Sequence, residues 1–144
     1  QERAMEAMVK KGSKVFVIDN IDWLQTDKRY DERTDEKCLR LLLDLKNFCK
    51  MWGVTIFLVA HVTKMNFEEI PQPNNVKNSG AFKQVADLML ILWRKTKGEK
   101  VTGTKTVATR RTNETLLWVA ENRRTGETGY VQLYFDGKKF IEML

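Results

Sequence analysis

The stretch from residue 14 to residue 61 constrains the fold of this chain more than any other. It opens with a short apolar run, residues 15–18, and closes with a second one, residues 54–60. Short continuous apolar runs are typical of strands buried on both faces in a parallel sheet. Between them, residues 34–52 carry apolar side chains at helical spacing, with acids in the first turn and lysines before Gly53. A strand, a helix and a strand in this order predict a βαβ unit of a parallel sheet.

One polar residue follows each of the two predicted strands. Asp19, with a second acid at Asp22, follows the first run, and His61, the only histidine of the chain, follows the second. Since the carboxyl ends of parallel strands meet at one edge of a sheet, both side chains should reach the rim where open α/β sheets bind ligands. An acid in this place helps nucleotide-hydrolysing proteins to hold Mg²⁺, usually through water. Most strand-end aspartates only cap a turn and most lone histidines are structural, so the pattern alone leaves both interpretations open.

The rest of the chain predicts further elements around this unit. Residues 2–11 and 80–85 are predicted helices, residues 62–79 a long loop, and residues 87–93 a third buried strand. Three more strands with polar turns between them predict an antiparallel extension of the sheet, at residues 115–120, 130–135 and 139–143. No repeat, low-complexity tract or linker interrupts the sequence, so we expect a single domain over residues 1–144.

Composition excludes several classes of protein. No apolar run reaches the roughly 18 residues that a membrane-spanning helix needs, and the first residues lack the apolar core of a secretory signal. Cys38 and Cys49 are too few and too widely spaced for a zinc site or a disulfide framework. We therefore expect two reduced thiols in a cytosolic-type protein.

The net charge of +6 is concentrated in one segment. Residues 94–111 hold seven basic residues and Glu99 as the only acid (7 − 1 = +6), whereas the rest of the chain holds 18 of each sign (25 − 7 and 19 − 1). This concentration indicates a segment that either faces a polyanion or is merely solvated. Its middle, residues 98–106, is rich in Gly and Thr, which is compatible with an exposed hairpin or a mobile loop.

Four segments carry a recognisable pattern: VFVIDNIDWLQ, VTIFLVAHVTK, KNSGAFKQVADLMLILWR and ENRRTGETGYVQLYFDG. In this order and at this spacing they resemble the motor domain of DnaB-like ring-shaped replicative helicases. The first resembles the Walker B segment of that family, and the second resembles the next strand, which ends in a polar phosphate sensor. The third resembles RxSGAxxQxAD and the fourth KxRxxGxxG. The sensor residue is Gln in bacterial members of the family and His in the phage type. His61 therefore makes this chain similar to the branch that contains the phage primase–helicases and the mitochondrial helicase.

The resemblance implies a role for each matched residue. Asp19 would hold Mg²⁺ through water, and His61 would sense the γ-phosphate of ATP. Arg123 would be the arginine finger that enters the ATP site of the next subunit. Arg124 is adjacent, and a one-residue slip in the match would exchange the two. Four residues would line the central channel and hold the phosphates of single-stranded DNA, namely Lys77, Asn78, Ser79 and Gly80.

The family implies an α/β fold with a RecA-like P-loop NTPase core, in which helices flank a parallel sheet, here extended by C-terminal antiparallel strands. It implies an ATP-dependent replicative DNA helicase that translocates on single-stranded DNA and unwinds duplex DNA, with ATP and Mg²⁺ as cofactors and a hexameric ring as assembly. No GxxxxGK[ST] loop occurs in the sequence. Because the family places that loop well before Walker B, we expect the chain to be the C-terminal part of a larger motor domain, inactive as an ATPase by itself. The expected location is a bacterial or phage-infected cytoplasm, or the mitochondrial matrix or nucleoid.

Two departures from the family pattern stand out. Glu121 occupies the position of a lysine that contacts the γ-phosphate of the adjacent subunit, so either Arg124 compensates or activation between subunits is weak. The basic segment of residues 94–111 matches nothing specific, and a DNA-contacting insertion is one interpretation of it. Two other function classes stay open: another RecA-type ATPase, such as a strand-exchange protein or a clock-type phosphotransferase, and a non-enzymatic DNA-binding or assembly module.

Overall fold

The computed structural model describes residues 2–21, 34–63, 69–100 and 107–143. The chain divides into two compact units, one of residues 1–61 and 76–85 and one of residues 62–75 and 86–144. Residues 22–33, which include Asp22 and the end of the Walker B-like segment, lie outside the described residues. The single domain over the whole chain stays a prediction.

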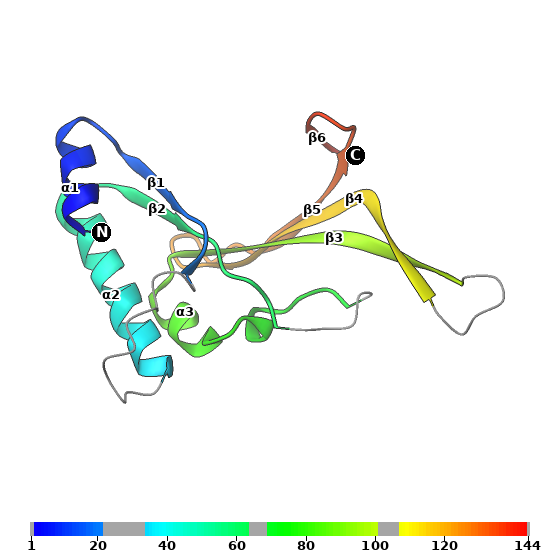
Figure 1. Cartoon of the computed structure of the whole chain (residues 1–144), viewed down its shortest axis with the longest axis horizontal. Helices are drawn as coiled ribbons and strands as arrows, with labels where there is room; N and C mark the ends of the chain where they lie inside the picture. The colour runs from blue at the N-terminus through cyan, green and yellow to red at the C-terminus, as the bar shows by residue number, and fades with distance from the viewer. Residues whose placement is uncertain (1, 22–33, 64–68, 101–106, 144) are drawn as a thin grey trace. The chain divides into compact units, whose positions relative to one another are not determined.

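The first unit contains the βαβ arrangement that the sequence predicts (Figure 1). Strands β1 (Val15–Ile18) and β2 (Thr55–Leu58) pair in parallel, with Ile18 opposite Leu58. Helix α2 (Thr34–Trp52) connects them and has the bounds predicted for it. Two further helices complete the unit, α1 (Glu2–Lys10) and α3 (Ser79–Val85).

Helix α2 organises the core of this unit. Its buried side chains include Cys38, Leu42 and Phe48. Phe48 meets Phe16 of β1 edge to face, with ring centroids 6.3 Å apart, a geometry that aromatic pairs prefer. Helix α3 packs on α2 with buried Ala81, Phe82 and Val85, and the Lys46 ammonium donates a hydrogen bond of 3.3 Å to the Val85 carbonyl. Neither Cys38 nor Cys49 forms a disulfide within the described residues.

The prediction that β1 is buried on both faces is wrong for this structure. Val15, Val17 and Phe57 are at least half exposed, whereas the alternate residues Phe16 and Ile18 are partly buried. Side chains of a strand point alternately to the two faces of a sheet. Within the described residues, α2 contacts the face that carries Phe16, and the opposite face remains open.

The second unit contains a four-stranded antiparallel sheet in the order β3-β4-β5-β6. Its strands are β3 (Leu88–Lys100), β4 (Val107–Asn122), β5 (Gly129–Phe135) and β6 (Phe140–Glu142). A short 3-10 helix, η2 (Pro73–Asn75), belongs to the same unit. The antiparallel pairing of the C-terminal strands is therefore confirmed, but within the described residues these strands form a sheet of their own rather than an extension of the β1–β2 sheet. The described fold is mixed α/β with a parallel part of only two strands.

Two predictions about this sheet need correction. Residues 88–93 do form a strand, as the first part of β3, but β3 pairs antiparallel with β4. Leu88, Leu90 and Leu92 are 46–61% exposed and Ile91 is buried, so one face of the strand is covered and the other is not. Strand β4 begins at Val107 rather than at residue 115, because it pairs with β3 as far as Lys100. Of the two alternatives for the basic segment, the described residues thus form the hairpin, while residues 101–106 lie outside them.

The turn between β5 and β6 has a clear local cause. The Asp136 carboxylate accepts hydrogen bonds of 2.8 and 2.9 Å from the amides of Lys138 and Lys139, which lower the pKa of this exposed carboxyl. Gly137 takes a φ of +98°, which residues with a Cβ adopt only at a cost. Among the residues described in the two units, no helix is both long and apolar enough to cross a membrane.

Candidate functional site

Asp19 and His61 lie at the same edge of the parallel sheet. Asp19 directly follows β1, and His61 comes shortly after β2. The pairing continues beyond the strands, since the amide of Val59 donates to the Ile18 carbonyl at 2.9 Å and the amide of Ile21 donates to the Val59 carbonyl at 3.1 Å. Both polar side chains are exposed, and the Asp19–Asn20 peptide bond is cis. The structure thus brings the two residues to the carboxyl edge, where open α/β sheets bind their ligands.

The donor set at this edge fits a magnesium ion that is held through water. Asp19 offers one exposed carboxylate at the strand end. In the part of the chain that the structure describes, no three His, Cys, Asp or Glu side chains converge as a metal site. Mg²⁺ in nucleotide sites keeps several waters and takes one or two carboxylates together with phosphate oxygens. A single carboxylate is therefore sufficient for this mode of binding, in which water and ATP fill the remaining positions.

The segment of residues 77–80 forms a tight turn into α3. Asn78 has a φ of 60°, a left-handed conformation that asparagine tolerates better than most residues. Its carbonyl accepts hydrogen bonds from the amides of Ala81 at 3.0 Å and Phe82 at 3.5 Å. The segment borders a surface pocket of about 360 Å³, lined by Glu36, Leu39, Asn78, Ser79, Gly80, Ala81 and Gln84. Glu36 is a charged neighbour that the motif did not indicate.

Arg123 and Arg124 lie in a turn that the Asn122 side chain holds closed. The Asn122 carbonyl oxygen Oδ1 accepts hydrogen bonds from the amides of Arg124 at 3.2 Å and Thr125 at 3.3 Å, and Nδ2 donates to the Thr125 hydroxyl at 2.8 Å. Gly126, with a φ of +75°, donates its amide to the Asn122 carbonyl at 2.8 Å. Sequence reasoning missed Asn122, although asparagine followed by polar residues and glycine favours such turns.

Arg123 has neighbours from two sequence motifs. Its backbone amide donates a hydrogen bond of 2.9 Å to the carbonyl of Asp87, the last residue of the SGAxxQxAD-like motif. Its guanidinium Nε lies 3.7 Å from a carboxylate oxygen of Glu121, the residue that departs from the family pattern. Both side chains are partly exposed, so water screens this ion pair.

The predicted site residues divide between the two units. Asp19, His61 and residues 77–80 belong to the first unit, whereas Arg123 and Arg124 belong to the second. The roles assigned to these residues by resemblance stay predictions.

Comparison with known protein families decides the class of the chain. The family model of the DnaB-like helicase C-terminal domain matches residues 1–141. The chain belongs to this family. A DnaB-like helicase C-terminal domain is a RecA-like ATPase domain that serves DNA replication, so the match favours the helicase interpretation over a recombinase or a clock-type phosphotransferase. Comparison with curated proteins found no match.

Proposed function

We propose that this DnaB-like chain forms the C-terminal part of the motor domain of a replicative helicase of the phage-like branch. In the complete motor, ATP hydrolysis drives translocation on single-stranded DNA and the unwinding of duplex DNA. The observation that carries the proposal is the placement of Asp19 and His61 at the carboxyl edge of the parallel strands, in a chain whose family is that of DnaB-like helicases. The phage-like assignment rests on His61 as the polar residue after β2.

Asp19 and His61 have different roles at this edge, one toward the metal ion and one toward the γ-phosphate. When bound, ATP provides the phosphate bond that is broken, and Mg²⁺ neutralises part of the charge of its phosphates. The Asp19 carboxylate would hold the ion through its water shell. His61 would contact the γ-phosphate and so respond to its loss. We propose that the same contact links the state of the nucleotide to residues 77–80, which follow His61 in the sequence.

Arg123 acts on the ATP site of a neighbouring copy of the chain. A guanidinium supplied from the next subunit stabilises the charge that develops during phosphoryl transfer. This arrangement requires a head-to-tail contact between identical subunits, and we propose that these contacts close into a hexameric ring. Arg124, one residue further in the Asn122-held turn, provides a second positive charge where Glu121 replaces the lysine of the family.

Residues 77–80 contact the backbone of single-stranded DNA. Lys77 and Gly80 are exposed, and the turn at Asn78 presents backbone groups beside them. Contacts of this kind position a strand without reading its bases. Because the Glu36 carboxylate lines the adjoining pocket, we expect phosphate at the exposed side of the turn and away from α2. Such a motor works where DNA replicates, in a bacterial or phage-infected cytoplasm or in a mitochondrial nucleoid.

The direct test is DNA-stimulated ATP hydrolysis by a protein that carries the complete motor domain with its phosphate-binding loop. Asp19→Asn should lower kcat roughly 100-fold, because the ion loses the carboxylate that orients its water shell. The matched control is Asp44→Asn, which removes an exposed carboxylate of α2 in the same unit and should leave kcat unchanged. Absence of DNA-stimulated hydrolysis in the wild type would leave a DNA-binding or assembly module as the function.

A further inference from the structure

The tip half of the β3–β4 hairpin is a two-stranded ribbon, here called the arm and defined as residues 96–100 of β3 and 107–111 of β4. The pairing of β4 with β5 covers Glu114 to Val119, so the arm strands pair only with each other (Figure 1). An isolated two-stranded ribbon is marginally stable in water. The described arm strands therefore gain little stability from pairing with the rest of the sheet.

Basic side chains occupy both faces of the arm. Lys97 lies directly opposite Arg110, which places two like charges side by side on one face. Arg111 lies opposite Thr96 on the other face. Lys97, Arg110 and Arg111 are exposed. Two like charges that lie directly opposite each other destabilise an antiparallel strand pair. A polyanion bound over the ribbon would be attracted by both charges and would offset their repulsion.

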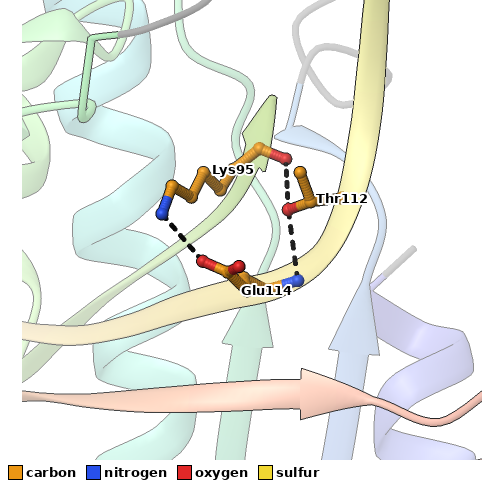
Figure 2. A network of polar contacts seen from close by, with 3 residues as sticks. All are labelled: Lys95, Thr112 and Glu114. Atoms are coloured by element: carbon orange, nitrogen blue, oxygen red, sulfur yellow. Dashed lines mark hydrogen bonds and ion pairs between the residues drawn. The ribbon is translucent and has the colours of Figure 1, made fainter. Parts of the chain in front are cut away.

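A polar network holds the base of the arm in shape (Figure 2). The register of the hairpin shifts between Arg94 and Thr96. At this position the Thr112 hydroxyl donates a hydrogen bond of 2.9 Å to the Lys95 carbonyl and accepts one of 3.2 Å from the Glu114 amide. The Lys95 ammonium lies 2.8 Å from the Glu114 carboxylate. Glu114 thus pairs with Lys95 and is also attracted by the charge of Lys97, whereas Arg110 and Arg111 lie beyond this network on the arm.

We propose that the arm binds duplex DNA through its phosphates, with residues other than those of the turn at 77–80. The major groove of B-DNA admits a two-stranded β-ribbon, and positive charge on both faces of such a ribbon meets the phosphate rows on both sides of the groove. Proteins that hold single strands without sequence preference stack bases on aromatic side chains, and residues 94–111 contain no aromatic residue. The arm therefore suits duplex DNA better than a single strand, and it holds the duplex without reading its sequence.

This inference extends the proposed function, because a helicase works where single-stranded and duplex DNA meet. The binding step itself needs no ATP, so it is tested independently. The 144-residue chain is titrated onto a fluorescein-labelled duplex and onto one of its labelled single strands, and anisotropy is followed between about 50 and 200 mM salt. The variant combines Lys97→Gln, Arg110→Gln and Arg111→Gln. A matched control removes the same charge elsewhere, with Lys10→Gln, Lys138→Gln and Lys139→Gln.

The arm variant should bind the duplex at least about tenfold more weakly at low salt, and the slope of log affinity against log salt should fall by about 2.7, which is 0.9 for each lost phosphate contact. The control should change duplex affinity less than about threefold. Arg110→Lys, which keeps the charge, should retain duplex binding. Thermal unfolding of the arm variant should begin no earlier than that of the wild type, since the repulsion between Lys97 and Arg110 is gone.

Two outcomes would overturn the inference. Equal losses for the duplex and for the single strand would show that the arm does not select duplex DNA. Equal losses in the arm variant and in the control would show that only the net charge matters. Both comparisons stay valid if the proposed ATPase activity is absent, because neither uses ATP. Lys77→Gln should weaken single-strand binding and leave duplex binding by the arm unchanged.

Discussion

The carboxylate of Glu121 lies 3.7 Å from the guanidinium Nε of Arg123, two positions further along the same chain. The acid that replaces the family lysine thus attracts, within its own chain, the arginine that we propose acts on the next subunit. The pair is partly exposed, and such pairs contribute about 0–1 kcal/mol. The contact is weak enough for Arg123 to leave it when a stronger anion arrives.

Glu121→Gln should therefore raise DNA-stimulated ATP hydrolysis of the complete motor by at most about fivefold, because the arginine no longer leaves an ion pair to reach the neighbouring ATP site. The free energy of unfolding should change by less than about 1 kcal/mol. Steady-state hydrolysis and urea denaturation measure the two effects. Glu127→Gln, which removes an exposed acid next to the same turn, is the control and should alter neither. A fall in hydrolysis for Glu121→Gln would mean that the glutamate positions Arg123 productively.

The pKa of Glu114 reports on the base of the arm. The hydrogen bond from Lys95, together with the charge of that lysine, holds the Glu114 pKa below its ordinary value of 4.5. Because the folded pKa is lowered, the interaction stabilises the fold above the unfolded pKa and is lost as the pH falls through the folded pKa. An NMR titration should show a Glu114 pKa below 4.5 in the wild type and a return toward that value in Lys95→Met. An identical pKa in the two proteins would show that the contact does not persist in solution.

The core of the first unit depends on Phe48. This side chain is 5% exposed and contacts both Phe16 and Trp52, with ring centroids 6.3 and 6.2 Å away. Phe48→Ala should lower the free energy of unfolding by about 3–5 kcal/mol, through lost burial and the cavity that remains. Met51→Ala, on the same helix but 74% exposed, should cost less than about 0.5 kcal/mol. Chemical denaturation of both variants tests this, and similar losses would mean that α2 presents a different face to the sheet.

The sequence predicted best those helices and strands whose bounds depend only on their own residues. The bounds of α2 agree with the prediction because the apolar stripe of residues 34–52 and the glycine after it are local features. The parallel pairing of β1 with β2 followed from the order strand, helix, strand, and it placed Asp19 and His61 at one edge.

The errors arose where a strand depends on its neighbours. The apolar run of residues 87–93 indicates side chains that favour burial, but it does not say which strand pairs with β3 or what covers each face, and Leu92 proves exposed. Strand β4 extends back to Val107 because β3 offers it hydrogen-bond partners, although its basic and threonine-rich start carries no apolar signal. Contacts such as Glu121 with Arg123 depend on turn geometry and side-chain rotamers that no residue pattern encodes.

The central claim is an ATP site shared between two copies of the chain, with Asp19 from one and Arg123 from the next. The measurement that tests it most directly is hydrolysis by mixed rings of Asp19→Asn and Arg123→Ala forms of the complete motor. Each variant alone should be nearly inactive. Random mixing in equal amounts should restore about a quarter of the wild-type rate, because one interface in four then pairs an intact Asp19 with an intact Arg123. A mixture that stays as inactive as its components would contradict the shared site and the ring motor built on it.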